Sequence, residues 1–90
     1  MILNYCNTLP HKIRTMDNKE FLKKVGLKLK VIRSLRGISQ DDIVNKLDID
    51  KSYYSKVERG LTNPTPLYMK NLSDFLEVKL EDLLNLNINI

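Results

Sequence analysis

The chain has 90 residues, of which 42% are hydrophobic, and this is enough for one compact domain but leaves little for a second. Its fifteen lysines and arginines against eleven acidic residues give a net charge of +4, which favours a polyanionic partner. A single cysteine excludes an intrachain disulfide and a cysteine-based zinc site, and without a long apolar run or a signal-peptide pattern we expect a soluble, cytoplasmic protein with no membrane partner.

Residues 1–18 mix polar residues and proline with scattered apolar ones and show no sustained period, so we expect an N-terminal arm. From Glu20 onward, apolar residues recur at steps of three and four, which predicts an amphipathic helix that ends at Gly37. Residues 20–37 carry six basic and one acidic side chain, so the positive charge is concentrated there. Lys28, Lys30 and Arg36 could add to the field that attracts phosphates, but an exposed charged face on any soluble helix looks the same, so a solvated face is expected for most of them.

Two short helices with a tight turn between them are predicted next. Ser39 is a good N-cap for a helix over residues 40–47, whose first turn carries carboxylates that suit the positive end of the helix dipole. Asp50 is the N-cap expected for a third helix over residues 51–59, which Gly60 ends. Capping by itself would explain both Ser39 and Asp50.

The rest of the chain predicts a turn-rich loop over residues 61–66 and two more helices. The fourth helix starts near Pro66, and the fifth covers about residues 80–85. Five helices in about 65 residues indicate a compact all-α bundle. The last seven residues alternate strictly between apolar and polar, which is typical of a strand, but asparagine is a poor strand former, so a frayed tail is equally open.

The most specific pattern lies in residues 37–44 and 47–60. It resembles the helix-turn-helix signature of the Cro/repressor (XRE-like) family, and the resemblance extends over about residues 22–84. It implies a five-helix bundle of the lambda-repressor-like DNA-binding type. The expected organisation is an arm over residues 1–18, a helix-turn-helix domain over 19–85 and a tail over 86–90 that could form a dimerisation strand.

Some residues of the signature are expected to have structural roles. Arg33 and Glu58 recur in the family as a salt bridge between the first and third helices. Two positions depart from the family pattern, because Val44 stands where alanine is usual and Asp48 stands where glycine is usual. Val44 could slightly widen the packing between the second and third helices. Asp48 is tolerable, since aspartate is among the few non-glycine residues that adopt positive φ.

The resemblance implies that the third helix enters the DNA major groove, where each base pair presents a distinct pattern of donors and acceptors. Lysine favours guanine O6 and N7, and serine is promiscuous. For Tyr53, contact with a thymine methyl or a phosphate and simple packing on the helix are both open, whereas Tyr54 is expected in the core. The base-reading residues implied by position are Lys51, Ser52, Tyr53 and Lys56.

Contacts with the DNA backbone are expected from two other places. Gln40 and the free amides after Ser39, at the N-terminus of the second helix, could bind one phosphate. Capping does not require a glutamine at position 40, which favours the phosphate role. Thr62 and Asn63 in the loop could bind another phosphate.

These features predict sequence-specific binding of double-stranded DNA for transcriptional regulation, by a homodimer on a palindromic operator, as in a repressor, Cro-like or controller protein. We expect no enzyme, because one histidine, one cysteine and no partnered carboxylate cluster make no catalytic site. No cofactor, metal or small-molecule ligand is expected, since Cys6 and His11 alone make a poor metal site. The alternative is an antitoxin-like or other protein-interaction module whose helical core binds DNA secondarily.

Self-association is expected to use the fifth helix together with Leu86, Ile88 and Ile90, whose apolar surface a monomer could not bury fully. Pairing of residues 2–5 with residues 86–90 as short strands is one arrangement that would provide it. A twofold dimer would place two third helices about 34 Å apart, which matches a palindromic site.

Overall fold

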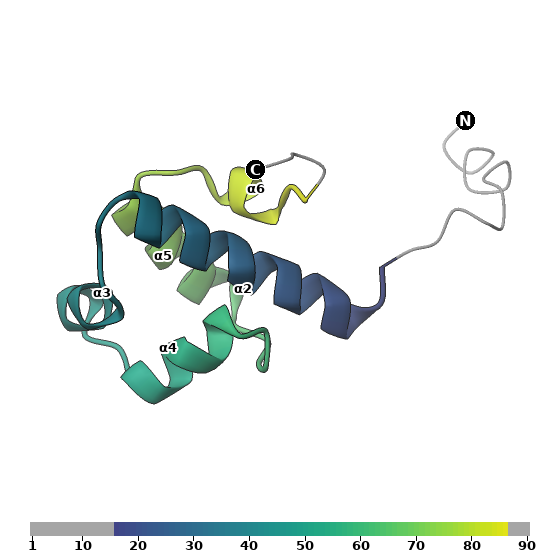
Figure 1. Ribbon diagram of the computed structural model, residues 1–90, viewed down its shortest axis with the longest axis horizontal. Helices are drawn as coiled ribbons and strands as arrows, with labels where there is room; N and C mark the ends of the chain where they lie inside the picture. Colours follow the sequence, from purple (N-terminus) through teal and green to yellow (C-terminus); the bar gives the residue numbers. More distant parts are fainter. Residues whose placement is uncertain (1–15, 87–90) are drawn as a thin grey trace, which may run out of the picture.

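The computed structural model describes residues 16–86, and within that range it contains five helices and no strand (Figure 1). The all-α prediction is therefore confirmed. Most of the expected arm (residues 1–15) and the end of the tail (residues 87–90) lie outside the described residues, as do Cys6 and His11. The helices are α2 (Asn18–Leu35), α3 (Gln40–Leu47), α4 (Lys51–Glu58), α5 (Pro66–Leu76) and α6 (Leu80–Leu84).

Four of these helices begin at a side chain that accepts a hydrogen bond from a free backbone N–H of the first turn. The predicted caps of α3 and α4 are confirmed, and α2 begins two residues before its expected start because Asp17 caps it. At α3 the capping is reciprocal: Ser39 Oγ accepts from Asp42 N at 3.0 Å, and Asp42 Oδ2 accepts from Ser39 N at 2.9 Å. The four caps are Asp17, Ser39, Asp50 and Thr65.

Residues with a left-handed backbone conformation lie at the ends of α3 and α5. Asp48, the C-cap of α3, has φ 54° and ψ 52°, which confirms the positive φ expected at this departure from the family pattern. Glu77 has φ 59° at the end of α5, where nothing in the sequence had indicated a left-handed residue. Each of these residues allows the chain to turn sharply into the next element at some cost in backbone strain.

The core is built from buried apolar side chains of all five helices, and the buried position predicted for Tyr54 is confirmed. The backbones of α2 and α4 also approach each other closely at Gly26 in α2. A Cβ atom at Gly26 would lie 2.4 Å from the carbonyl oxygen of Glu58, so only glycine lets α2 approach the end of α4 this closely. The buried apolar residues are Val25, Leu29, Ile43, Val44, Tyr54, Val57, Met69, Leu72, Leu76 and Leu83.

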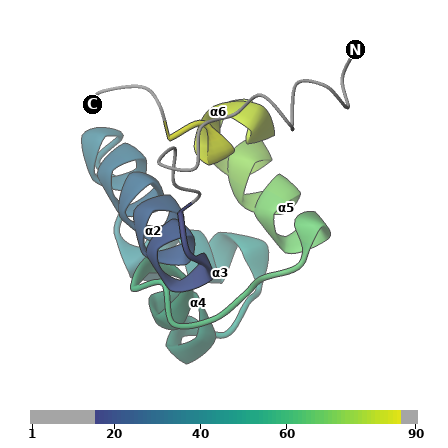
Figure 2. The same ribbon diagram turned by 90° about the vertical axis from the view of Figure 1, so that its right-hand side faces the viewer.

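The long helix α2 lies between the two ends of the bundle. The pair α3 and α4 lies at one end, α6 lies at the opposite end, and α5, which contacts α6, lies across the bundle from α2 (Figures 1 and 2). Tertiary contacts of α2 with both α4 and α6 support this arrangement. The end formed by α3 and α4 carries the residues that the sequence predicted to contact DNA. Within residues 16–86, no helix is both long enough and apolar enough to cross a bilayer.

The expectation that Lys28 lies on a solvated face is wrong. Its side chain is buried, with 7% of the residue exposed. Its Nζ donates to the carbonyl oxygens of Asp82 and Asn85, the latter at 2.8 Å. The ammonium group therefore satisfies carbonyl groups at the end of α6 and attaches this short helix to α2.

Candidate nucleic-acid interface

The start of α4 presents polar side chains on one side of the helix and core residues on the other. Lys51, Ser52 and Lys56 are exposed, whereas Tyr54 and Val57 are buried. Asp50 fixes the first turn, because its Oδ2 accepts from Tyr53 N at 2.8 Å. Three of the four residues predicted to read bases therefore lie on the open side of a capped helix that the core holds in place.

Tyr53, the fourth of these residues, is half-buried. Its ring meets that of Tyr68 in α5 edge to face, with the ring centroids 5.2 Å apart and an angle of 81° between the planes. Burial raises the pKa of Tyr68 to about 12, with smaller contributions from Tyr53 and Asp50. The packing role considered for Tyr53 is thus present, and its contact with DNA stays a prediction.

The predicted salt bridge between Arg33 and Glu58 is present, and both side chains are almost fully buried. Arg33 Nε lies 2.6 Å from Glu58 Oε2 and Nη2 lies 3.1 Å from Oε1, so the pair is bidentate. Arg33 Nη1 also donates to the carbonyl oxygen of Ile38 at 2.7 Å, ahead of α3. The pair therefore joins α2 to α4 and to the segment that leads into α3.

Two further side chains donate to Glu58, and neither contact was predicted from the sequence. The Tyr54 hydroxyl donates to Oε2, and Gln40 Nε2 donates to Oε1 at 2.9 Å. Burial by itself raises the pKa of Glu58, but the hydrogen bonds from Arg33, Tyr54 and Gln40 outweigh it and leave the pKa below its usual value. Burial and the bond to this carboxylate also raise the pKa of Tyr54. Glu58 is thus a charged hub that fixes α4 relative to α2 and α3.

The N-terminus of α3 is the first place where a contact with the DNA backbone was predicted. Ser39 is exposed, and its hydroxyl is used in the capping box with Asp42. The hydrogen bonds with Ser39 lower the pKa of Asp42. Gln40 is half-buried, and one amide hydrogen is directed to Glu58, which leaves its second N–H and its carbonyl oxygen for other partners.

The loop after α4 is the second such place. Thr62 is half-buried and Asn63 is exposed. Both line a cavity of about 430 Å³ together with Lys19 and Lys23 from the first turns of α2. The fold thus brings two basic residues from α2 to the loop whose polar side chains were predicted to bind a phosphate, and sequence periodicity alone had not indicated this juxtaposition.

One contact at this end of the molecule involves Asp41, for which the sequence predicted only an interaction with the helix dipole. Lys51 Nζ in α4 lies 2.7 Å from Asp41 Oδ1 in α3. The ten-residue separation across the turn is not a helical spacing, so only the placement of α3 against α4 reveals the pair. Among the described residues, no group of three histidine, cysteine or acidic side chains is placed to hold a metal ion.

Known proteins resemble this chain over the same region. "HTH-type transcriptional regulator SinR" from Bacillus licheniformis is 36% identical over 62 residues, which cover 68% of this chain and 56% of that protein. "Control protein C.MunI" from Mycoplasma sp is 31% identical over 61 residues, covering 67% of this chain and 82% of that protein. The chain thus spans little more than half the length of SinR.

Solved structures agree with the sequence relatives. The restriction-modification controller protein C.AhdI from Aeromonas hydrophila superposes with a TM-score of 0.66 at 31% identity, over 69% of this chain and 94% of that one. The DNA-binding domain of BldD superposes with a TM-score of 0.68 at 29% identity, over 78% of this chain and all of that one (100%). Residues 19–83 match the helix-turn-helix family (HTH_3). The chain therefore belongs to the helix-turn-helix family, as its resemblance to the Cro/repressor signature predicted.

Proposed function

We propose that this protein binds double-stranded DNA sequence-specifically, without catalysing a reaction, and thereby regulates transcription in the cytoplasm. The observation that carries the proposal is the start of α4, where Lys51, Ser52 and Lys56 are exposed on a helix that Tyr54 and Glu58 attach to the core. A helix fixed in this way fits a major groove and presents donors to base edges. Relatives described as transcriptional regulators and a controller protein support the proposal.

The proposed contacts with the DNA backbone lie at the start of α3 and in the loop after α4. Ser39 and Gln40 at the start of α3 bind one phosphate, and Thr62 and Asn63 bind another with help from the lysines of α2 that share their cavity. These backbone contacts set the orientation in which α4 enters the groove. The residues proposed to read bases are Lys51, Ser52, Tyr53 and Lys56.

A selection experiment tests this function. Fragments bound from a random duplex library should converge on a palindrome, and the affinity for the selected duplex should fall steeply with salt. Lys56→Ala should relax the preference at particular base pairs, by about 1 to 3 kcal/mol, whereas Gln40→Ala should weaken binding to all sequences similarly. Equal, sequence-independent losses in both variants would contradict the roles, and a folded protein that enriches no sequence would favour the protein-interaction alternative.

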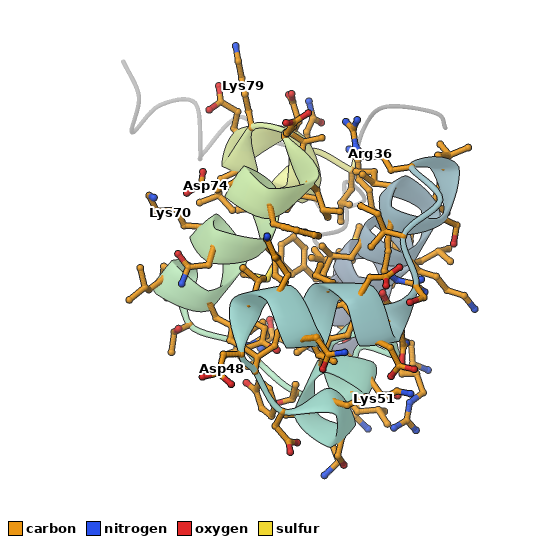
Figure 3. All side chains as sticks on the ribbon, turned by 90° about the vertical axis from the view of Figure 1, so that its left-hand side faces the viewer. Arg36, Asp48, Lys51, Lys70, Asp74 and Lys79 are labelled. Atoms are coloured by element: carbon orange, nitrogen blue, oxygen red, sulfur yellow. The ribbon has the colours of Figure 1, made fainter. Side chains whose placement is uncertain are left out.

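Lys79→Ala is the matched control for Lys56→Ala. Lys79 is exposed and lies at the opposite end of the molecule from Lys51 (Figure 3). The substitution removes the same charge from a surface that would not face DNA. It should leave the preferred sequence unchanged.

The palindrome is expected because we propose that the protein acts as a homodimer. Phe21 in α2 and Leu84 in α6 are 37% and 41% exposed, although both line the same apolar cleft. A second copy would cover this surface and place two α4 helices about 34 Å apart. Leu84→Lys should shift the sedimentation of the protein toward the monomer, whereas Leu67→Lys, at a leucine that is 65% exposed on α5, should not.

A further inference from the structure

The ion pair between Asp41 and Lys51 joins the two helices of the helix-turn-helix at their first turns. Asp41 is the second residue of α3, Lys51 is the first residue of α4, and their charged atoms are 2.7 Å apart. Both side chains remain more than half exposed, at 66% and 55%. The pair therefore lies on the surface proposed to face DNA, and neither member serves the core.

The region proposed to meet DNA carries no excess of positive charge. Residues 38–64, which contain α3, α4 and the following loop, carry four basic and five acidic side chains. The positive charge of the chain is concentrated in α2 instead, where residues 20–37 carry six basic side chains and one acidic. A phosphate backbone attracts any free lysine regardless of sequence. In this region, the pairing of a lysine with an aspartate weakens that indiscriminate attraction.

We propose that Asp41 is a specificity-determining residue that positions Lys51 for base reading and reduces its attraction to phosphates. This inference rests on the proposed DNA-binding function. The lysine ammonium has three N–H donors, of which the aspartate takes one and leaves two for acceptors such as guanine O6 and N7. The pair has no net charge, so it gains little from a phosphate. It also restricts a long side chain that is otherwise free to rotate toward the nearest phosphate.

The proposal predicts opposite changes on two kinds of DNA. In Asp41→Asn, the affinity for an unrelated duplex should rise about two- to fivefold at low salt, which is the range that exposed ion pairs are worth. The affinity for the selected duplex should stay the same or fall, so the ratio between the two affinities should drop. Lys51 would then neutralise one more phosphate on the unrelated duplex, and the slope of log K against log salt there should steepen by about 0.9.

A double-mutant cycle separates positioning from general repulsion between Asp41 and DNA. If Asp41 acts through Lys51, Asp41→Asn should have no effect on either duplex in a Lys51→Gln background. A rise that persists in that background would overturn the proposal, because the aspartate would then act on DNA directly. An equal rise on both duplexes in the single variant would also overturn it, because the aspartate would then only compete with DNA for the lysine.

The chain offers a matched control in α5. Lys70 Nζ and Asp74 Oδ2 are also 2.7 Å apart and similarly exposed, at 59% and 64%. This pair lies on the opposite side of the molecule from Lys51 in Figure 3. Asp74→Asn makes the same change in net charge and should leave the affinity ratio unchanged, whereas a drop equal to that of Asp41→Asn would overturn the proposal.

The same titrations distinguish failure of the proposed DNA-binding function from failure of the inference about Asp41. If the unaltered chain prefers no duplex, the proposed function fails and the inference fails with it. If the unaltered chain has a preference and Asp41→Asn keeps the whole affinity ratio, only the inference fails. Circular dichroism and thermal unfolding of each variant show whether α3 has kept its fold.

Discussion

At Glu58 a single carboxylate accepts hydrogen bonds from three side chains that come from three helices. The sequence predicted its bond to Arg33, because both residues recur in the family signature. The bonds from Tyr54 and Gln40 were not predicted, although Tyr54 stands four residues before Glu58 on the same helix and is within reach of it. That helical spacing is the signal that could have revealed this partner. No comparable spacing links Gln40 to Glu58.

Glu58→Gln should lower the free energy of unfolding by about 3 to 5 kcal/mol, because it leaves the buried guanidinium of Arg33 without its counter-charge. Urea denaturation monitored by circular dichroism measures this change. Glu77→Gln is the control, since it removes the same charge from an exposed position and should change stability by less than about 0.5 kcal/mol. Similar effects of the two substitutions would show that Glu58 is not the hub of the network.

The stability of the protein should also depend on pH through Glu58. Its pKa is lower in the folded state than the usual value of 4.5, so the unfolded state binds more protons between those two values. The contribution of Glu58 is therefore fully present above about pH 4.5 and is lost as the pH falls through the folded pKa. Unfolding measured from neutral to acidic pH should show a steeper loss in the unaltered protein than in Glu58→Gln. Parallel curves would contradict this.

At the scale of the elements, the sequence predicted all five described helices, and the ends that it gave lie within about two residues of those observed; for α5 it gave only the start. It could do so because caps and amphipathic periods are local: Ser39 and Asp50 bond within their own first turns. The left-handed Asp48 was likewise predicted, since aspartate stands where the family usually has glycine. Glu77 was not predicted to be left-handed, because glutamate has no such preference and the turn into α6 imposes the conformation.

Asp48→Gly should raise the free energy of unfolding by about 0.5 to 1 kcal/mol, because glycine adopts a φ of 54° without strain. Glu77→Gly should give a larger gain, since glutamate tolerates the left-handed region less well than aspartate. Thermal unfolding compares the two variants. Asp48→Ala keeps the unfavourable φ without the tolerance of aspartate, so it should lower stability, and a gain from this variant would contradict the explanation.

At the scale of the whole molecule, Lys28 shows how a charged residue becomes part of the core. It is three residues from Val25 and four from Ile32 in α2, yet a solvated position was expected for its charge. What the sequence did not show is that the carbonyl groups at the end of α6 meet this face. The expectation of a solvated Lys28 was therefore wrong, because only the docking of α6 brings the carbonyl groups that allow its charge to be buried.

Lys28→Met should lower the free energy of unfolding by about 1.5 to 3 kcal/mol, because it keeps the apolar stem but removes the charged donor from the end of α6. Hydrogen exchange should show loss of protection in α6 before the rest of the bundle opens. Lys30→Met is the control, since Lys30 is exposed on the same helix and its loss should change stability by less than about 0.5 kcal/mol. Equal effects would mean that Lys28 does not hold α6.

The sequence by itself determined the helices, the caps of α3 and α4 and the family, because each depends on spacing within one element or on a family signature. Only the tertiary structure decided which polar side chains meet across helices: Gln40 with Glu58, Lys28 with the end of α6, and Asp41 with Lys51. The physical reason is that an ion pair or hydrogen bond requires a separation of about 3 Å. Helical periods fix the direction of a side chain but not the distance to a neighbouring helix.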